Sequence, residues 1–124
     1  MASFETVEWL KKAKRDLKAA KLNQENGLFE EAAFFAHQAA EKSLKAAYIS
    51  EFKRLRKIHD LVELGRELLA PMKIIVECDG LNPHYIAARY PMDVEYDELT
   101  SLKAIASAIK VVEWAEEKFL NSGK

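Results

Sequence analysis

The stretch from Ala32 to Ile49, AAFFAHQAAEKSLKAAYI, is the feature that most constrains the fold. Its apolar residues recur at helical spacing, yet they cover more than the single stripe expected of a helix lying on one core. They are Ala32, Phe35, Ala36, Ala39, Leu44, Ala46, Ala47 and Ile49. We therefore expect a helix that buries two faces, one against its own bundle and the other against a second chain or a further helix.

Polar residues interrupt this helix at a regular interval. His37 and Glu41 are four residues apart, and so are Glu41 and Lys45, which places each pair side by side on a helix. We expect His37 to be a packed histidine paired with Glu41. A metal site would need further donors nearby, and three histidines spread over the chain form no zinc pattern, so no metal and no cofactor is expected.

Composition restricts the classes of protein further. The 124 residues fit one domain, 1–124, and 49% hydrophobic with 31% charged residues is typical of a folded protein. The formal charge of -1 excludes nucleic-acid binding by bulk electrostatics, so any such binding needs a local patch. Cys78 is the only cysteine, which fits a reducing compartment and a buried apolar role. The start of the sequence has neither a signal peptide nor a membrane span, and we expect a cytoplasmic protein.

Helical periodicity also predicts the elements around the central helix. Ser3 or Thr6 caps a first helix that ends in a turn at Gly27, and the second helix runs from about Leu28 to about Phe52. Asp60 caps a third helix that stops at Pro71. Apolar residues of the first and third helices are Val7, Leu10, Ala13, Leu17, Ala20, Leu61, Leu64, Leu68 and Leu69.

The last part of the chain is less regular before it becomes helical again. We expect a short helix or turn over 72–76, a break at Asp79-Gly80, and a short helix over 84–88 after the turn at Asn82-Pro83. A final helix over about 97–120 buries Leu102, Ile105, Ala106, Ile109, Val112 and Phe119. The prediction is an all-α protein, a four-helix up-and-down bundle with a short irregular or helical insert before the last helix.

Four segments occur in an order that identifies a family resemblance: WLKKAKRDLKAA, GLFEEAAFFAHQAAEKSLKAAYI, KIHDLVELGREL and YIAARYP. In this order they resemble the higher eukaryotes and prokaryotes nucleotide-binding (HEPN) family over nearly the whole chain. The resemblance implies an all-helical bundle, usually a homodimer, often encoded beside a small nucleotidyltransferase. In some branches the resemblance also implies a metal-independent ribonuclease toxin of a toxin–antitoxin pair.

The ribonuclease branches carry an arginine followed, after four to six residues, by a histidine. Arg89 stands where the resemblance places the arginine, but the positions expected to hold the histidine are Val94, Glu95 and Tyr96. None of these has the pKa of an imidazole. The ribonuclease motif is therefore decayed in this chain. A formal match, Arg54 and His59, lies between the second and third helices, away from the register of the family's catalytic site.

One dense basic cluster offers the local patch that nucleotide binding would need. Lys53, Arg54, Arg56 and Lys57 precede His59, and together with the amides at the start of the third helix they would surround one phosphate. A solvated charged face is the simpler interpretation of the lysines, and His59 is alternatively structural, with its ring bonded to a backbone carbonyl.

A second candidate lies just before the last helix. Arg89 and Tyr90 precede a proline and would present a guanidinium and an aromatic face to a nucleotide, although pairing of Arg89 with Glu95 or Asp97 is an equally physical alternative. The acids that follow repel nucleic acid and favour a partner with a basic surface. They are Asp93, Glu95, Asp97 and Glu98.

The nucleotide-binding residues predicted from the sequence are Arg54, Arg56, His59, Arg89 and Tyr90. We predict a homodimeric nucleotide-binding or partner-binding module that works with a minimal nucleotidyltransferase and has no catalytic residues. The alternative is a metal-independent ribonuclease that uses Arg54 and His59. Trp9 and Trp114 are expected to be core or interface anchors, because no basic residues cluster around them in the sequence.

Overall fold

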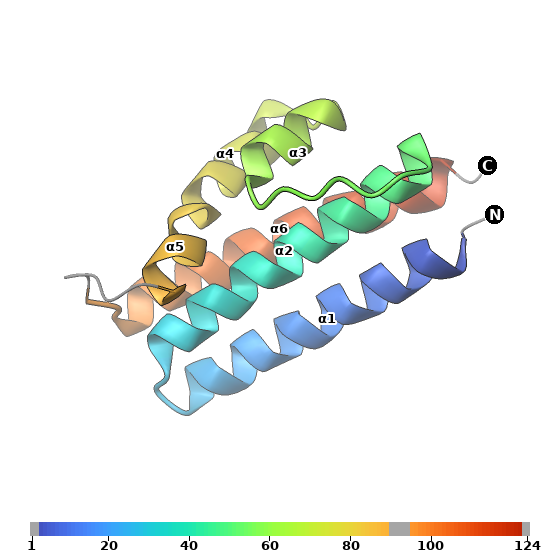
Figure 1. The fold of residues 1–124 in the computed structure, drawn as a ribbon. Coiled ribbons are helices and arrows are strands. Elements are labelled where there is room, and N and C mark those ends of the chain that lie inside the picture. Colours follow the sequence, from blue (N-terminus) through green and yellow to red (C-terminus); the bar gives the residue numbers. More distant parts are fainter. Residues whose placement is uncertain (1–2, 90–94, 123–124) are drawn as a thin grey trace.

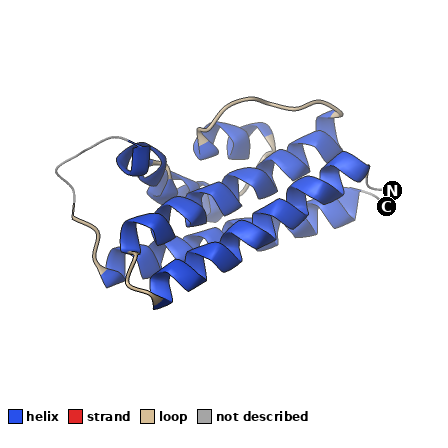
Figure 2. Ribbon diagram, turned by 60° about the horizontal axis from the view of Figure 1, so that its bottom comes forward, coloured by secondary structure: helices blue, strands red, loops and turns tan. Residues whose placement is uncertain are grey.

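Three long helices lie side by side and form the main body of the protein. The computed structural model describes residues 3–89 and 95–122. The long helices are α1 (Phe4–Glu25), α2 (Phe29–Phe52) and α6 (Glu98–Ser122). As Figure 1 shows, α1 runs opposite to α2 and α6, and the two termini lie at the same end of the bundle. Within the described residues every element is a helix (Figure 2), which confirms the all-α fold class.

The fourth position of the bundle is filled by short helices rather than by one long helix. They are α3 (Leu61–Glu67), α4 (Met72–Leu81) and α5 (Pro83–Arg89). Together they lead the chain back along α2 toward the start of α6 (Figure 1). The predicted up-and-down bundle with a helical insert before the last helix is therefore confirmed, with the insert itself supplying the fourth side.

Most of α2 is buried within a single chain. It contacts each of the other five helices, and every residue from Ala39 to Ile49 except Lys42 is buried. Alanines dominate this buried surface, and their small side chains let α1 and α6 approach closely. The prediction that α2 buries two faces is confirmed. The second face was expected to be covered by a second chain or by a further helix, and it is covered by further helices of the same chain. The breadth of this apolar surface is thus no argument for a second chain at α2.

Local signals account for most of the helix boundaries. The Ser3 hydroxyl accepts a hydrogen bond from the Thr6 amide, and the Asp60 carboxylate accepts from the amides of Val62 and Glu63, as expected of N-caps. Gly27 has φ of 75°, a left-handed conformation that suits the turn between α1 and α2. Gly65 lets α3 approach α4, because a Cβ there would lie 3.0 Å from the Ile75 side chain.

Several sequence predictions for individual residues are wrong. The dipeptide Asp79-Gly80 lies inside α4 instead of breaking it, since Cys78 and Leu81 on either side are buried and hold the helix together. Leu69 was expected to face the core, but it follows the end of α3 with φ of 60° and its side chain is 86% exposed. Leu102 and Ala106 are exposed as well, because their side of α6 has no neighbouring helix among the described residues.

Candidate functional site

A buried carboxylate on α2 lies at the centre of the candidate site. The Glu41 side chain is only 5% exposed, and both of its oxygens have partners. Oε2 accepts a hydrogen bond from the Lys45 ammonium at 3.0 Å, and Oε1 lies 2.9 Å from Nδ1 of His59. A buried carboxylate is costly unless its charge is compensated in this way. Glu41 thus joins its own helix to the loop that follows α2.

The buried ammonium of Lys45 is covered by α1. Its Nζ lies 5.8 Å from the ring centre of Trp9, within the range of a cation–π interaction. Lys45 therefore has a carboxylate on one side and an aromatic face on the other. Trp9, which the sequence predicted as a core or interface anchor, is half-buried and lies beside this charged pair.

His59 is held in one orientation while part of its ring remains open to solvent. Its side chain is 53% exposed, and its ring stacks on that of Tyr85 from α5 with centroids 4.4 Å apart. Because the Glu41 carboxylate is an acceptor, Nδ1 donates to it. Nε2 makes no hydrogen bond to the part of the chain that the structure describes. The prediction that the His59 ring bonds a backbone carbonyl is wrong, since a side-chain carboxylate takes that role.

His37 lies on the other side of this aromatic contact and is completely buried. Its ring centre is 5.3 Å from that of Tyr85, and its Nδ1 is 3.3 Å from the Gln38 amide nitrogen. Burial lowers the pKa of His37 to about 4, although the nearby Glu41 carboxylate partly opposes that shift. The expected packing of His37 is confirmed, but the hydrogen bonds of Glu41 go to Lys45 and His59 instead.

The basic cluster in the loop divides into paired and open side chains. Arg56 contacts Glu63 at 2.8 Å and Glu67 at 3.4 Å, so its charge is largely compensated. The Arg54 guanidinium lies 5.5 Å from the ring centre of the buried Tyr48, yet its side chain is exposed. The other exposed cations are Lys53 and Lys57.

Arg54 and His59 do not converge on one point. Arg54 rests on Tyr48 and His59 on Glu41, and these two anchors are seven residues apart on α2. Seven residues correspond to about 10 Å along a helix axis. Of the other predicted site residues, Arg89 is the last residue of α5 and Tyr90 lies outside the described residues. The side chain of Arg89 also lies outside the described part of the structure, and so does its expected pairing with Glu95 or Asp97.

Sequence reasoning missed Tyr85 and the contact between Glu41 and His59. It singled out Glu41 for its spacing to His37 and Lys45, but nothing local signals its contact with His59, which is 18 residues away. Tyr85 gave no signal either, because it lies in a short helix whose placement against His59 depends on the path of the whole insert. The one available signal was the HDL segment, in which Asp60 caps α3 and thereby fixes the loop beside it.

No group of histidine, cysteine and acidic residues suited to a metal ion occurs among the described residues. Cys78 is buried, and burial raises the pKa of its thiol to about 12, which makes it unreactive at neutral pH. None of the described helices is long and apolar enough to cross a bilayer. The chemistry available at the site is therefore that of an oriented imidazole, open cations and an aromatic face.

Because His37 is buried and its pKa is lowered, we predict that the folded protein loses stability in mild acid. Its pKa is 6.5 in the unfolded chain and about 4 in the folded one, so the unfolded state binds the extra proton between these values and stability falls as the pH drops through this window. The loss is of the order of 3 kcal/mol by pH 4. Replacing His37→Gln should flatten the dependence of the unfolding free energy on pH, measured by urea denaturation. A profile as steep as that of the wild type would contradict this assignment.

Comparison with known proteins places this arrangement in a family. The model of the HEPN domain matches residues 6–118. Among solved structures, TT1696 from Thermus thermophilus is 26% identical with a TM-score of 0.87, and covers 94% of this chain and 99% of its own. The archaeal HEPN homologue ST0689 is 25% identical with a TM-score of 0.81 and the same coverage.

An HEPN domain protein from Thermotoga maritima shares the fold at 21% identity, with a TM-score of 0.74 over 89% of this chain and 95% of its own. No curated protein matches the sequence. The family model nevertheless spans nearly all of the chain, including α2, the loop with His59 and most of α6. The protein belongs to the HEPN domain family.

Proposed function

We propose that the chain is a homodimeric nucleotide-binding module that works with a minimal nucleotidyltransferase partner. The observation that carries the nucleotide site is the half-exposed His59 ring, which Glu41 and Tyr85 hold in place on the loop that also carries the exposed cations Arg54 and Lys57. Such a surface offers a flat aromatic face to a base and positive charge to a phosphate. The homodimer and the partner enzyme are proposed from the family resemblance.

The loop that carries these groups is fixed at both ends, which lowers the entropic cost of binding. At its start, Lys53 adopts φ of 58° and its ammonium donates to the Ser50 carbonyl at 2.7 Å. At its end, Asp60 caps α3 and accepts from the Asn82 amide at 3.0 Å, while Asn82 accepts from the Leu61 amide. Arg54 and Lys57 therefore project from a loop whose backbone is already in position.

The absence of a histidine from the positions that should hold it after Arg89 agrees with binding as the main role. Arg54 and His59 rest on α2 side chains that are seven residues apart, which suits an extended ligand with several phosphates or a short RNA better than a single phosphate. We infer that Arg54 contacts phosphate and that His59 contacts the base or the sugar.

Isothermal titration with ATP, GTP and a short RNA tests this proposal. We expect heat of binding with at least one of them, and the double variant Arg54→Ala/His59→Ala should weaken that binding by about thirtyfold or more, since each of the two lost contacts to a charged group removes about 1–3 kcal/mol. Lys18→Ala is the matched control, because Lys18 is an exposed cation on α1. The absence of heat with all three ligands, or an equal loss in the control, would refute the nucleotide site.

The geometry of His59 also favours a second candidate, a metal-independent ribonuclease. An imidazole whose Nδ1 donates to a buried carboxylate has its other nitrogen available as a general base or acid. Nε2 would accept the proton of a ribose 2'-hydroxyl as the oxygen attacks the adjacent phosphorus, and the departing 5' oxygen would take a proton from water as its bond to phosphorus breaks. Arg54 is anchored too far along α2 to contact the same phosphate as His59. Lys57 is closer to His59 in the sequence and is the cation that would contact this phosphate.

Cleavage of a labelled RNA in the presence of EDTA separates the two candidates. If the chain is a ribonuclease, His59→Ala should lower the rate by about a hundredfold to ten-thousandfold, whereas Lys18→Ala should leave it unchanged. Circular dichroism of each variant checks that the helices remain. No cleavage by the wild type, or equal cleavage by wild type and His59→Ala, removes the ribonuclease and leaves the binding module.

A further inference from the structure

The outer side of α1 carries a dense group of like charges. The segment from Lys11 to Lys21 has six cations and one acid, so its net charge is +5. Because the whole chain has a formal charge of -1, the remainder of the chain carries a net charge of -6. All six cations are exposed, and they are Lys11, Lys12, Lys14, Arg15, Lys18 and Lys21. Positive charge is thus concentrated on one side of one helix.

Four of these six cations have no partner of opposite charge in the described part of the chain. Lys11 pairs with Glu8 at 3.3 Å, and Lys14 pairs with Glu116 at 2.5 Å. No ion pair of the other four cations is found among the described residues. Their charges are available to an anion outside the chain.

The acids of α1 leave the middle of this side clear. Asp16, the one acid of the segment, faces α2, where the Lys42 ammonium lies 2.5 Å from its carboxylate. Glu5 and Glu8 precede the segment, and Glu25 follows it. The three central turns of the helix therefore present cations alone to the solvent.

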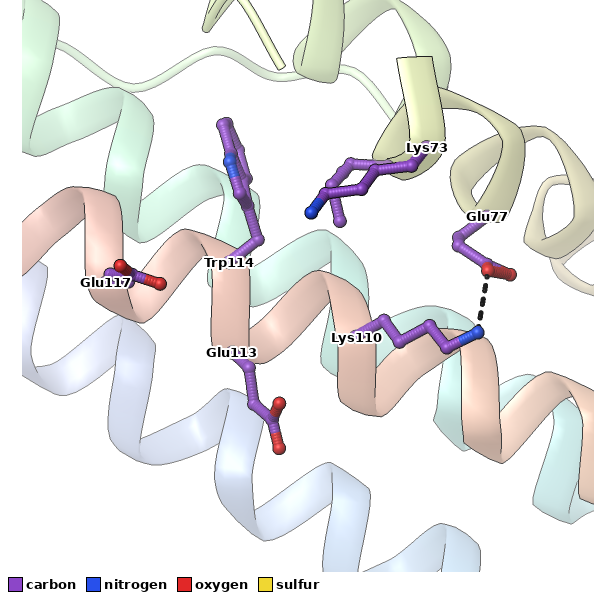
Figure 3. A pocket seen from close by; sticks show the side chains of 7 residues that line it. Lys73, Glu77, Lys110, Glu113, Trp114 and Glu117 are labelled. Carbon is purple, nitrogen blue, oxygen red and sulfur yellow. Dashed lines mark hydrogen bonds and ion pairs between the residues drawn. The ribbon is translucent and has the colours of Figure 1, made fainter. Parts of the chain in front are cut away.

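Other parts of the surface mix charges of both signs. In the cavity of about 390 Å³ between α4 and α6, Lys110 pairs with Glu77 at 3.4 Å, and Lys73 and Glu113 line the same space (Figure 3). Figure 1 shows α1 at one edge of the bundle, with α3, α4 and α5 on the far side of α2. Among the described residues, α1 contacts only α2 and α6. The outer side of α1 therefore differs from the rest of the surface and is uncovered.

Two exposed apolar side chains lie on the same side of α1 as the cations. Phe4 is 82% exposed, and Leu22 is 48% exposed. Lys11 and Lys18 follow Phe4 at steps of seven residues, and Leu22 follows Lys18 at a step of four, which places these residues on one side of the helix. The 18 residues from Phe4 to Leu22 span about 27 Å along the axis. The cationic side thus has an apolar residue at each end.

We infer that this side of α1 binds the surface of a bilayer that contains anionic phospholipids. The cations are attracted to the headgroup phosphates, and the exposed Phe4 and Leu22 enter the boundary between the headgroups and the acyl chains. A nucleic acid would offer phosphates to the same cations, but it would give these two apolar side chains no partner. The negative remainder of the chain is repelled by the same bilayer, so the molecule is oriented with α1 toward the lipid.

The nucleotide site proposed above stays open in this orientation. In Figure 1 the loop that carries His59 runs along α2 on the side away from α1. Neither Arg54 nor Lys57 belongs to the cationic side of α1. Lipid binding therefore goes beyond the nucleotide proposal, and either one can fail while the other holds.

Flotation with lipid vesicles tests the inference. The wild type should float with vesicles of phosphatidylglycerol and phosphatidylcholine in equal parts and not with vesicles of phosphatidylcholine alone. Added salt should release it, because the charges are exposed. Arg15→Gln/Lys18→Gln should raise the apparent dissociation constant by about twentyfold, since each cation near an anionic bilayer contributes about fivefold. Arg66→Gln/Lys73→Gln removes the same charges from α3 and α4 and should leave binding unchanged.

The apolar contact distinguishes a bilayer from other polyanions. Phe4→Ser should weaken vesicle binding by about tenfold or more, whereas Met72→Ser, at a 72% exposed position on α4, should not weaken it. Circular dichroism checks that each variant keeps its helices. Three outcomes would overturn the inference: no flotation with the anionic vesicles, equal losses in the α1 variant and its control, or binding to a duplex RNA with vesicle binding unaffected by Phe4→Ser. The last result would make this side of α1 a nucleic-acid surface.

Discussion

The buried carboxylate of Glu41 is the interaction on which the rest of the site depends. It lies on the buried side of α2, and it compensates the buried ammonium of Lys45 while it orients His59. Through Lys45 it reaches Trp9 on α1, and through His59 it reaches Tyr85 on α5. One charged group thus connects α1, α2, the following loop and α5. Removal of that charge would leave a buried cation without compensation and an imidazole held only by its stack on Tyr85.

The same contact explains why an exposed loop holds functional groups in place. Loops are usually the mobile parts of a domain, and a binding group on a mobile loop loses affinity to ordering. Here the His59 ring is held by a hydrogen bond to a buried carboxylate and by a stacked aromatic ring. The cap formed by Asp60 holds the next residue in sequence. The loop therefore presents its cations and its imidazole from a backbone with little freedom left to lose.

The fold was predictable from the sequence because its signals are local. Caps at Ser3 and Asp60, the turn at Gly27 and the broad apolar surface of α2 each reflect nearby residues, and each is found as expected. The break predicted at Asp79-Gly80 failed because burial on both sides of the dipeptide outweighs its weak helix propensity. The prediction that Leu102 is buried failed because apolar residues at helical spacing indicate a face of the helix but not whether another helix covers it.

The candidate site was predictable only in part, since its decisive contacts are not local. The four-residue spacing of Glu41 and Lys45 predicted that they lie side by side, and they form an ion pair. The contact between Glu41 and His59 depends on a loop that returns along α2. The position of Tyr85 depends on the packing of α3 and α4, which precede its helix. The sequence predicted residues that could bind a phosphate, but it could not predict that Arg56 is neutralised by Glu63 and Glu67 while Arg54 stays open.

A double-mutant cycle of Glu41 and Lys45, read by the free energy of unfolding, tests the central role of this buried pair most directly. Glu41→Gln alone should cost about 3–5 kcal/mol, because it leaves the ammonium buried without a counter-charge. Adding Lys45→Met should recover part of that loss, giving a coupling of about 1–3 kcal/mol between the two sites. A loss below about 1 kcal/mol for Glu41→Gln, of the size expected for an exposed ion pair, with purely additive effects in the cycle, would contradict the account.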